Sequence, residues 1–245
     1  LHAAASELAR AKRVLVITGA GISADSGLPV YRGQGGLYDD RETDDGMAIE
    51  TALSGAMLRA RPEVTWKHLL QIARAGVGCE PNAAHHALVA METSGRFARC
   101  TVLTQNVDSF HARAGSRDLI EMHGDLRTLH CRRCGYDTPM PDPSVLDGPP
   151  VCPCCSSVMR PSIVLFGEAL PADAVRQYEE RLAAGVDCVL VVGTSAGFPY
   201  IAEPVAAAAR SGFPTIEINP ARSEVSYLVR HRLPLRAAEA LPALM

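Results

Sequence analysis

His123 and four cysteines that follow it are the residues of this 245-residue chain whose types and spacing could most clearly do chemistry. An imidazole titrates near neutral pH, so His123 is a candidate general base. The pairs Cys131–Cys134 and Cys152–Cys155 each have a two-residue gap, and together they show the spacing of a structural zinc site. Four thiolates complete a tetrahedron around one zinc ion, so such a site stabilises a fold and does not catalyse.

Other interpretations of these residues stay open at this point. The four cysteines could instead be buried or disulfide-bonded, and His123 could be a satisfied imidazole at a strand end. Cys154 lies one residue before Cys155, too close to share a knuckle turn with it, and we interpret it as a spare thiol.

A glycine motif near the start of the chain predicts nucleotide binding. Gly19-x-Gly21-x-x-Ala24 follows the apolar run 14–18 and precedes a helical pattern, which is the context that a dinucleotide fingerprint requires. Glycines permit a tight turn and a close approach of the backbone to a pyrophosphate at the N-terminus of the next helix.

Further polar residues follow other apolar runs. Gln105-Asn106-Val107-Asp108 comes after Thr104, Gly193-Thr194-Ser195 comes after Val192, and Asn219 comes after Ile218. Each group alone could be a helix cap or a turn. Because ligands of doubly wound sheets bind beyond the carboxyl ends of the strands, we expect all of these groups, with the glycine motif, to meet in one crevice.

The elements that must position these residues alternate along the chain. Continuous apolar strands separated by helices predict a parallel sheet covered on both faces. Strands are expected at 14–18, 101–104, 119–122, 188–192 and 215–218. Helices are expected at 2–12, 47–59, 63–75, 83–95, 108–114, 172–184 and 199–211.

Two insertions interrupt the predicted sheet. Residues 35–95 are helical and residues 128–160 carry the cysteines, and each insertion is too small to form a good core alone. The predicted fold class is therefore α/β, a doubly wound, Rossmann-like parallel sheet with a smaller inserted helical plus zinc-binding domain. The sheet domain is expected to comprise 1–34, 96–127 and 161–245.

Composition narrows the class of protein. Hydrophobic residues make up 47% and aromatic residues 5%, which suits a soluble α/β enzyme. A net charge of −3 gives no general attraction for nucleic acid. The chain has no apolar run long enough for a membrane span and lacks the basic start of a signal peptide. We expect a cytoplasmic monomer that binds neither nucleic acid nor membranes, since free and metal-bound thiols suit a reducing compartment.

At these motifs the sequence resembles the sirtuin family, in the family's order from about residue 14 to residue 240. The matching segments are Gly19 to Pro29, Tyr31-Arg32-Gly33, Thr104 to Asp108, His123-Gly124, the zinc cysteines, Phe166-Gly167-Glu168, Gly193-Thr194-Ser195 and Asn219. In that family Arg160-Pro161 follows the last zinc cysteine at the spacing seen from Cys155, which favours Cys155 over Cys154 as the ligand.

The resemblance implies an NAD-dependent protein lysine deacylase, which consumes NAD as a co-substrate and releases nicotinamide and O-acyl-ADP-ribose. It implies one structural zinc ion, and His123, Asn106 and Arg32 as catalytic residues. The implied NAD-binding residues are Gly19, Ala20, Gly21, Ile22, Arg32, Gln105, Asn106, Val107, Asp108, Gly193, Thr194, Ser195, Asn219 and Ala237. An acyl-lysine protein or peptide is implied as the partner, added as a strand at Val164, Phe166, Gly167 and Glu168.

Departures from the family bear on the acyl group. The branch that removes malonyl and succinyl groups binds the acyl carboxylate with a Tyr-x-x-Arg pair on the helix before Pro81-Asn82. The nearest pair in this chain is His68-x-x-Gln71, which offers no guanidinium fork. With His68 and Gln71 as acyl-pocket residues we expect neutral acyl groups to be preferred, unless Arg59, Arg61 or Arg74 reaches the pocket. The glycine expected near the adenine is missing around Leu235–Ala237.

Two other functions remain possible on the same scaffold. One is a mono-ADP-ribosyltransferase, which would need His123 less and an acceptor side chain instead. The other is a non-catalytic module that senses NAD or ADP-ribose. The presence of Arg32, Asn106, Asp108 and His123 argues against a module without catalysis.

Overall fold

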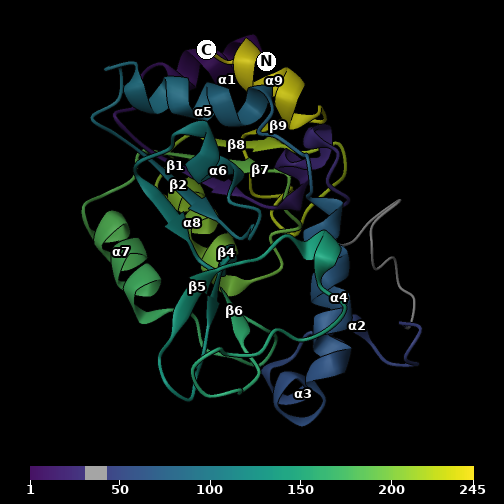
Figure 1. Ribbon diagram of the computed structural model, residues 1–245. Coiled ribbons are helices and arrows are strands. Elements are labelled where there is room, and N and C mark those ends of the chain that lie inside the picture. Colours follow the sequence, from purple (N-terminus) through teal and green to yellow (C-terminus); the bar gives the residue numbers. More distant parts are fainter. Residues whose placement is uncertain (31–42) are drawn as a thin grey trace.

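The computed structural model describes residues 1–30 and 43–245, and its framework is a six-stranded parallel sheet (Figure 1). The strand order is β3-β2-β1-β7-β8-β9, so the chain builds one half of the sheet outward from β1 and then crosses to build the other half. The strands are β1 (Arg13–Thr18), β2 (Arg99–Thr104), β3 (Leu119–Glu121), β7 (Cys188–Val192), β8 (Thr215–Ile218) and β9 (His231–Leu233). The predicted doubly wound class is confirmed.

Helices cover both faces of this sheet (Figure 1). One face packs against α1 (His2–Leu8), α5 (Ala83–Thr93) and α9 (Ala237–Ala243). The other packs against α7 (Ala172–Ala183) and α8 (Pro199–Arg210). All five residues of β7 and all four of β8 are buried, which explains why β7 reads as a continuous apolar run; β8 also buries Thr215 and Glu217.

A smaller unit packs beside the sheet. Its antiparallel sheet has the order β5-β4-β6, with β4 (Gly124–His130), β5 (Asp137–Pro139) and β6 (Arg160–Ile163). Its helices are α2 (Ile49–Ala52), α3 (Gly55–Ala60) and α4 (Pro62–Ala75). The two insertions share one core, in which the fully buried Trp66 donates its indole N–H to the carbonyl of Met159 at 3.0 Å.

Several elements differ from the sequence prediction. The helix expected at 47–59 is two short helices, because Ser54 adopts extended backbone between them and caps α3 by accepting from the N–H of Met57. The glycine motif itself contains a 3₁₀ turn, η1 (Ala20–Ile22), and a second one, η2 (Ala24–Ser26), begins at its last residue where a helix was expected. The helix expected at 108–114 begins at Phe110 as α6 (Phe110–Ala114).

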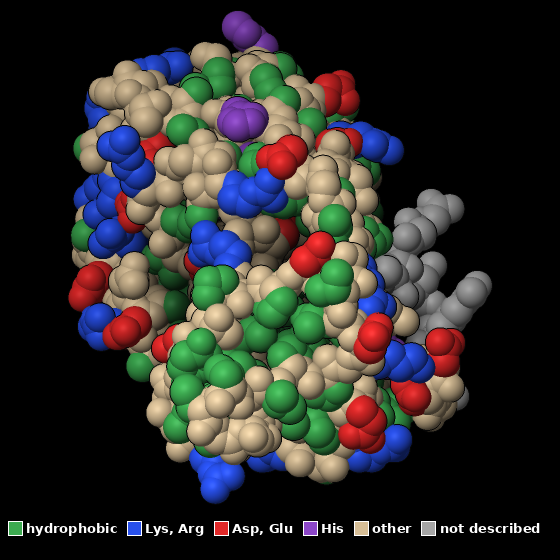
Figure 2. Space-filling model, viewed as in Figure 1, with side chains coloured by type: hydrophobic (Ala, Val, Ile, Leu, Met, Phe, Trp, Pro, Cys, Tyr) green, Lys and Arg blue, Asp and Glu red, His purple; other side chains and the backbone are tan. Residues whose placement is uncertain are grey.

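β9, α9 and the antiparallel sheet were not predicted at all. β9 has three residues and lies at the sheet edge, so it has no long apolar run to reveal it. In the parts of the chain that the structure describes, no helix has both the length and the apolar character needed to cross a membrane. Acidic and basic side chains are interspersed on the face shown in Figure 2, and apolar side chains gather over the smaller unit.

Candidate functional site

The polar strand ends meet at the carboxyl edge of the sheet, as predicted. The last residue of β1, Thr18, is in register with Thr104 of β2 and Val192 of β7, so the loops that follow these strands are neighbours. The N–H of Gly21 donates to the carbonyl of Gly193 at 2.8 Å. The Gln105 amide donates to the Thr194 hydroxyl, also at 2.8 Å.

The glycines of the motif are required by contacts between these loops. A Cβ atom added at Gly19 would lie 2.7 Å from Cβ of Thr194, and one at Gly21 would lie 2.7 Å from Cα of Gly193. Real Cβ atoms do not approach other atoms so closely. Packing within the protein alone therefore requires glycine at both positions, whether or not a ligand is bound. Gly193 itself has a φ of +58°, a conformation that favours glycine.

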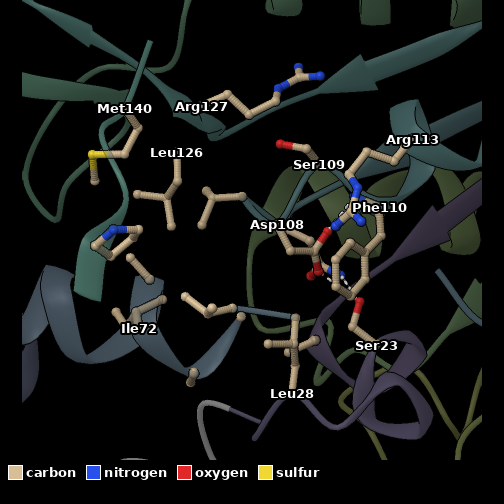
Figure 3. Close-up of a pocket in the computed structure, with 18 of the residues that line it drawn as sticks. Ser23, Leu28, Ile72, Asp108, Ser109, Phe110, Arg113, Leu126, Arg127 and Met140 are labelled. Atoms are coloured by element: carbon tan, nitrogen blue, oxygen red, sulfur yellow. Dashed lines mark hydrogen bonds between the residues drawn. The ribbon is translucent and has the colours of Figure 1, made fainter. Parts of the chain in front are cut away.

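A buried polar network holds the side chains of Asn106 and Asp108. Figure 3 shows the part of it between Ser23 and Asp108. The Asn106 amide donates to the carbonyl of Gly19 at 3.1 Å and to the Ser23 hydroxyl at 3.3 Å. Ser23 donates in turn to the Asp108 carboxylate at 2.7 Å, and Asp108 also accepts from the N–H of Phe110, the first residue of α6, at 2.9 Å. Burial raises the pKa of Asp108, while its hydrogen bonds and Arg113 oppose that shift. Both groups are therefore held in place without a ligand.

A cavity of about 290 Å³ lies between the sheet and the smaller unit (Figure 3). Its polar end presents Ser23, Asn106 and Asp108. Its apolar end is formed by Leu28, from the loop after η2, and by three side chains of the smaller unit, Ile72, Leu126 and Met140. The cavity can therefore accept a ligand that is polar at one end and apolar at the other.

His123 lies in the two-residue connection between β3 and β4, and both of its ring nitrogens are engaged. Nδ1 is 3.0 Å from the carbonyl oxygen of Gln105, which can only accept, so Nδ1 carries the hydrogen of the neutral ring. Nε2 is then the proton-accepting atom, and the Tyr200 hydroxyl lies 2.7 Å from it. Burial lowers the pKa of His123, and the Gln105 carbonyl opposes that shift. A neutral imidazole suits a general base.

The segment implied to bind substrate bridges the two units. The N–H of Val164 donates to the carbonyl of His123 at 2.9 Å, and the N–H of Phe166 donates to the carbonyl of Leu53 at 3.0 Å. Glu168 accepts from both terminal nitrogens of Arg160 at 2.7 and 2.8 Å, which fixes this turn. Gly167 has a φ of +77°, and the Phe166 side chain is 43% exposed.

The remaining predicted NAD-binding residues differ in their contacts and burial. Asn219 donates to the carbonyl of Thr194 at 3.0 Å, which brings the end of β8 to the same loop. Ser195 is exposed, whereas Ala237 is buried in the core at the start of α9. Arg32 lies outside the described residues.

His68 and Gln71 form the predicted pair but do not line the cavity. His68 Nδ1 lies 3.1 Å from the Gln71 side-chain oxygen, and its Nε2 lies 3.2 Å from the Asp45 carboxylate. The His68 side chain is buried, and on the next turn of α4 it is Ile72 that lines the cavity.

The four predicted cysteines come together in the smaller unit, where Cys131 and Cys152 are part of its buried core. Their sulfur atoms all lie within 4.8 Å of one another, and the pairs Cys131–Cys155 and Cys134–Cys152 have sulfurs 3.5 Å apart. A tetrahedral zinc ion with bonds of about 2.3 Å places sulfurs about 3.8 Å apart, so the donor set fits zinc. All four are free thiols, which rules out the disulfide alternative, and Cys154 is exposed outside the cluster.

The two cysteine pairs lie on turns of the same design. In each turn, the N–H four residues after the first cysteine donates to that cysteine's carbonyl, from Gly135 to Cys131 at 2.9 Å and from Ser156 to Cys152 at 2.8 Å. Gly135 and Ser156 both have positive φ. This shared geometry explains why the two-residue gap aims both sulfurs at one point.

Sequence reasoning did not assign roles to Ser23 and Tyr200. Ser23 lies inside the quoted motif and could have been found as the polar residue nearest the glycines. Tyr200 lies 77 positions from His123 in the chain, and no spacing rule connects the two.

A dinucleotide-type sheet, a polar crevice at its carboxyl edge and a four-thiolate unit beside it together define one class of protein. The chain belongs to the Sir2 family, whose sequence model matches residues 19–198. This confirms the resemblance to sirtuins.

Curated relatives match over nearly the whole chain. An NAD-dependent protein deacylase 2 of Pseudomonas syringae pv. tomato is 48% identical over 245 residues, which cover 99% of this chain and 98% of the relative. An NAD-dependent protein deacylase 2 of Pseudomonas aeruginosa is 46% identical over 242 residues, which cover 97% of this chain and 93% of the relative.

Solved structures share the fold. A Sir2 homologue in complex with NAD has a TM-score of 0.86 and 31% identity, over 100% of this chain and 92% of the other. A Sir2 chain with a deacetylated p53 peptide and 3′-O-acetyl ADP-ribose has a TM-score of 0.86 and 28% identity, over 98% and 95%.

Proposed function

We propose that this Sir2-family chain is an NAD-dependent protein lysine deacylase in which His123 is the general base. The observation that carries the proposal is the geometry of the crevice. The neutral imidazole has its Nδ1 fixed by Gln105, and the loop that provides this carbonyl also carries the buried Asn106 and Asp108. The similarity to curated NAD-dependent protein deacylases over almost the full chain supports it.

NAD is consumed as a co-substrate in this reaction, since it supplies nicotinamide as the leaving group and the ribose that receives the acyl group. Asn106, Asp108 and Ser23 line the polar end of the cavity, where they are placed to bind the carboxamide of nicotinamide and its ribose. His123 takes the proton from a ribose hydroxyl, so that this oxygen can attack the acyl carbon. Gly19 to Ile22 and Gly193 to Ser195 provide backbone close to the remainder of the dinucleotide.

The apolar end of the cavity supports a preference for neutral acyl groups. Ile72, Leu126 and Met140 offer no partner for a carboxylate, which costs several kcal/mol to bury unpaired. Two arginines also line the cavity, and both already have acidic partners: Arg113 lies 2.6 Å from Glu80, and Arg127 lies 3.1 Å from Asp125. We place the acyl group at this end, next to α4, with His68 and Gln71 behind it.

The partner is an acyl-lysine protein or peptide. The solved Sir2 structure that contains a p53 peptide and NAD supports this class of partner. In this chain the segment from Val164 to Glu168 joins His123 to the smaller unit, and it is the place where an extended peptide could add as a strand. We further propose that the protein acts as a monomer, and that it is cytoplasmic because free and zinc-bound thiols suit a reducing compartment.

A panel of acyl-lysine peptides with NAD tests this proposal. Mass spectrometry should detect free lysine peptide, nicotinamide and O-acyl-ADP-ribose, with acetyl or a longer neutral acyl group as the best substrate. ADP-ribose attached to protein, without loss of the acyl group, would favour the mono-ADP-ribosyltransferase instead. Binding of NAD without any product would favour the sensing module.

A further inference from the structure

The proton-accepting nitrogen of His123 is already occupied. Tyr200, the second residue of α8, places its hydroxyl oxygen 2.7 Å from His123 Nε2. Because Nδ1 carries the ring hydrogen and faces the Gln105 carbonyl, Nε2 has the lone pair and the phenol is the donor. The Tyr200 hydroxyl therefore occupies the position from which a proton must reach Nε2 of His123.

Tyr200 is held on the imidazole by contacts on several sides. Its ring stacks on Phe198, with centroids 5.6 Å apart and planes 17° apart. Its backbone carbonyl accepts from the hydroxyl of Tyr178, a largely buried residue of α7, at 2.7 Å. Phe198 also meets the His123 ring edge to face at 5.8 Å. The phenol is therefore part of the packed wall of the crevice.

An sp² nitrogen has one lone pair, which points in one direction. A substrate hydroxyl cannot bond Nε2 while the Tyr200 hydroxyl lies there, so it must either displace an anchored side chain or reach the base through it. We propose that Tyr200 is a catalytic residue that relays the proton of the ribose hydroxyl to His123. This inference rests on the proposed deacylase function.

The relay balances without any further reagent. The ribose O–H bond breaks as its proton passes to the Tyr200 oxygen, and the Tyr200 O–H bond breaks as its proton passes to Nε2 of His123. The ribose oxygen keeps the electron pair with which it attacks the acyl carbon. Tyr200 ends the step neutral, and His123 ends it as imidazolium. Burial raises the pKa of Tyr200 above its ordinary value, which disfavours a free phenolate, so the two transfers must occur together.

The substitution Tyr200→Phe removes the hydroxyl and keeps the ring that stacks on Phe198. We expect the rate of O-acyl-ADP-ribose formation to fall by roughly 10²- to 10⁴-fold, the usual contribution of acid–base catalysis. Exchange of labelled nicotinamide into NAD, which requires no proton removal from the hydroxyl, should continue at the wild-type rate. Tyr227→Phe makes the same chemical change at a side chain that is 80% exposed, and it should leave both rates unchanged.

Two further measurements separate a relay from a purely structural role. A proton inventory in mixtures of H₂O and D₂O should be curved for the wild type, because two protons move in one step, and linear for the residual activity of Tyr200→Phe. The double variant with His123→Ala should be no slower than His123→Ala alone, since residues that act as one unit are not additive.

Near-normal O-acyl-ADP-ribose formation by Tyr200→Phe would overturn the relay, because the substrate hydroxyl would then reach His123 directly. Equal losses of nicotinamide exchange and acyl transfer would also overturn it, since they would indicate a damaged site. A wild-type protein that forms no O-acyl-ADP-ribose from any acyl peptide would refute the deacylase function itself, so the two failures can be told apart.

Discussion

The cysteine cluster and the polar crevice hold their functional groups in different ways. The four cysteine sulfurs project from two turns, one with Cys131 and Cys134 and one with Cys152 and Cys155. The strands near these turns, β4, β5 and β6, have only three to seven residues each. The side chains of the crevice are held by one another, as in the chain from Asn106 through Ser23 to Asp108. The smaller unit therefore depends on an ion at the cysteine cluster to complete its fold, whereas the sheet edge is organised by contacts within the protein.

Removal of one zinc ligand should destabilise the protein more than any other change considered below. Cys152→Ser should abolish stoichiometric zinc binding and unfold the cysteine unit, because the binding free energy of a structural zinc site, about 10–16 kcal/mol in zinc-finger peptides, is folding free energy. Metal analysis and circular dichroism of the purified variant check this. Activity should be lost as a secondary consequence, since β4 and β6 flank His123 and Val164.

Cys154→Ser is the matched control, because Cys154 is exposed and outside the cluster. It should keep one zinc per chain and an unchanged unfolding temperature. Loss of zinc from this variant would show that the ligand set is wrong.

The next largest effect concerns acid stability of the sheet domain. His85 and His111 are buried in contact, with ring centroids 4.9 Å apart, and burial lowers their pKa values to about 4 and about 3. The unfolded chain, in which histidine has a pKa of about 6.5, therefore binds protons first as the pH falls. The contribution of the two histidines to the free energy of unfolding should be complete above pH ~6.5. Below that pH it should decline by up to about 1.4 kcal/mol per pH unit for each histidine.

Urea unfolding at several pH values between 7 and 5 measures this slope. His111→Gln should flatten it, while its amide can still donate to Thr18, the present partner of the ring at 2.9 Å. His2→Gln changes an exposed histidine and should leave the slope as it is. A slope unaffected by His111→Gln would contradict this explanation of the buried pair.

The smallest of these effects is a choice between acyl groups, which probes the crevice rather than its folding. Because Ile72 lines the apolar end of the cavity, the wild type should prefer acetyl over succinyl peptide by at least about tenfold in kcat/KM, the equivalent of roughly 1.4 kcal/mol. Ile72→Arg should narrow or reverse this ratio by offering the carboxylate a bidentate partner.

Ile72→Leu keeps the cavity apolar and serves as the control, with a ratio close to that of the wild type. A wild-type preference for succinyl peptide at pH 8 would refute the acyl preference.

The two regions also differ in how far the sequence predicted them. The cysteine site was predicted residue by residue because a knuckle turn is local, and two residues of spacing suffice to define it. Five of the six parallel strands were predicted to within two residues at each end, and four of these, β1, β2, β7 and β8, are buried along almost their whole length. β9 was missed because an edge strand of three residues with His231 and Arg232 has no apolar pattern.

Contacts made at long range were beyond sequence reasoning. Tyr200 reaches His123 only because α8 packs against the sheet beside the loop after β3, a consequence of strand order and not of spacing. Ile72, and not His68, lines the cavity because the direction of each α4 side chain depends on how the helix is rotated against β4. The pairing of His85 with His111 arises in the same way from the packing of α5 against α6.

Zinc content, thermal unfolding and product formation, all determined on one preparation of His123→Ala, separate the role of the crevice from that of the cysteine cluster. If the crevice catalyses and the cysteine unit only stabilises, this variant should keep one zinc and its wild-type unfolding temperature. Its formation of O-acyl-ADP-ribose should fall by roughly 10²- to 10⁴-fold while nicotinamide exchange persists. Product formation near the wild-type rate, in a folded and zinc-loaded variant, would show that His123 is not the general base.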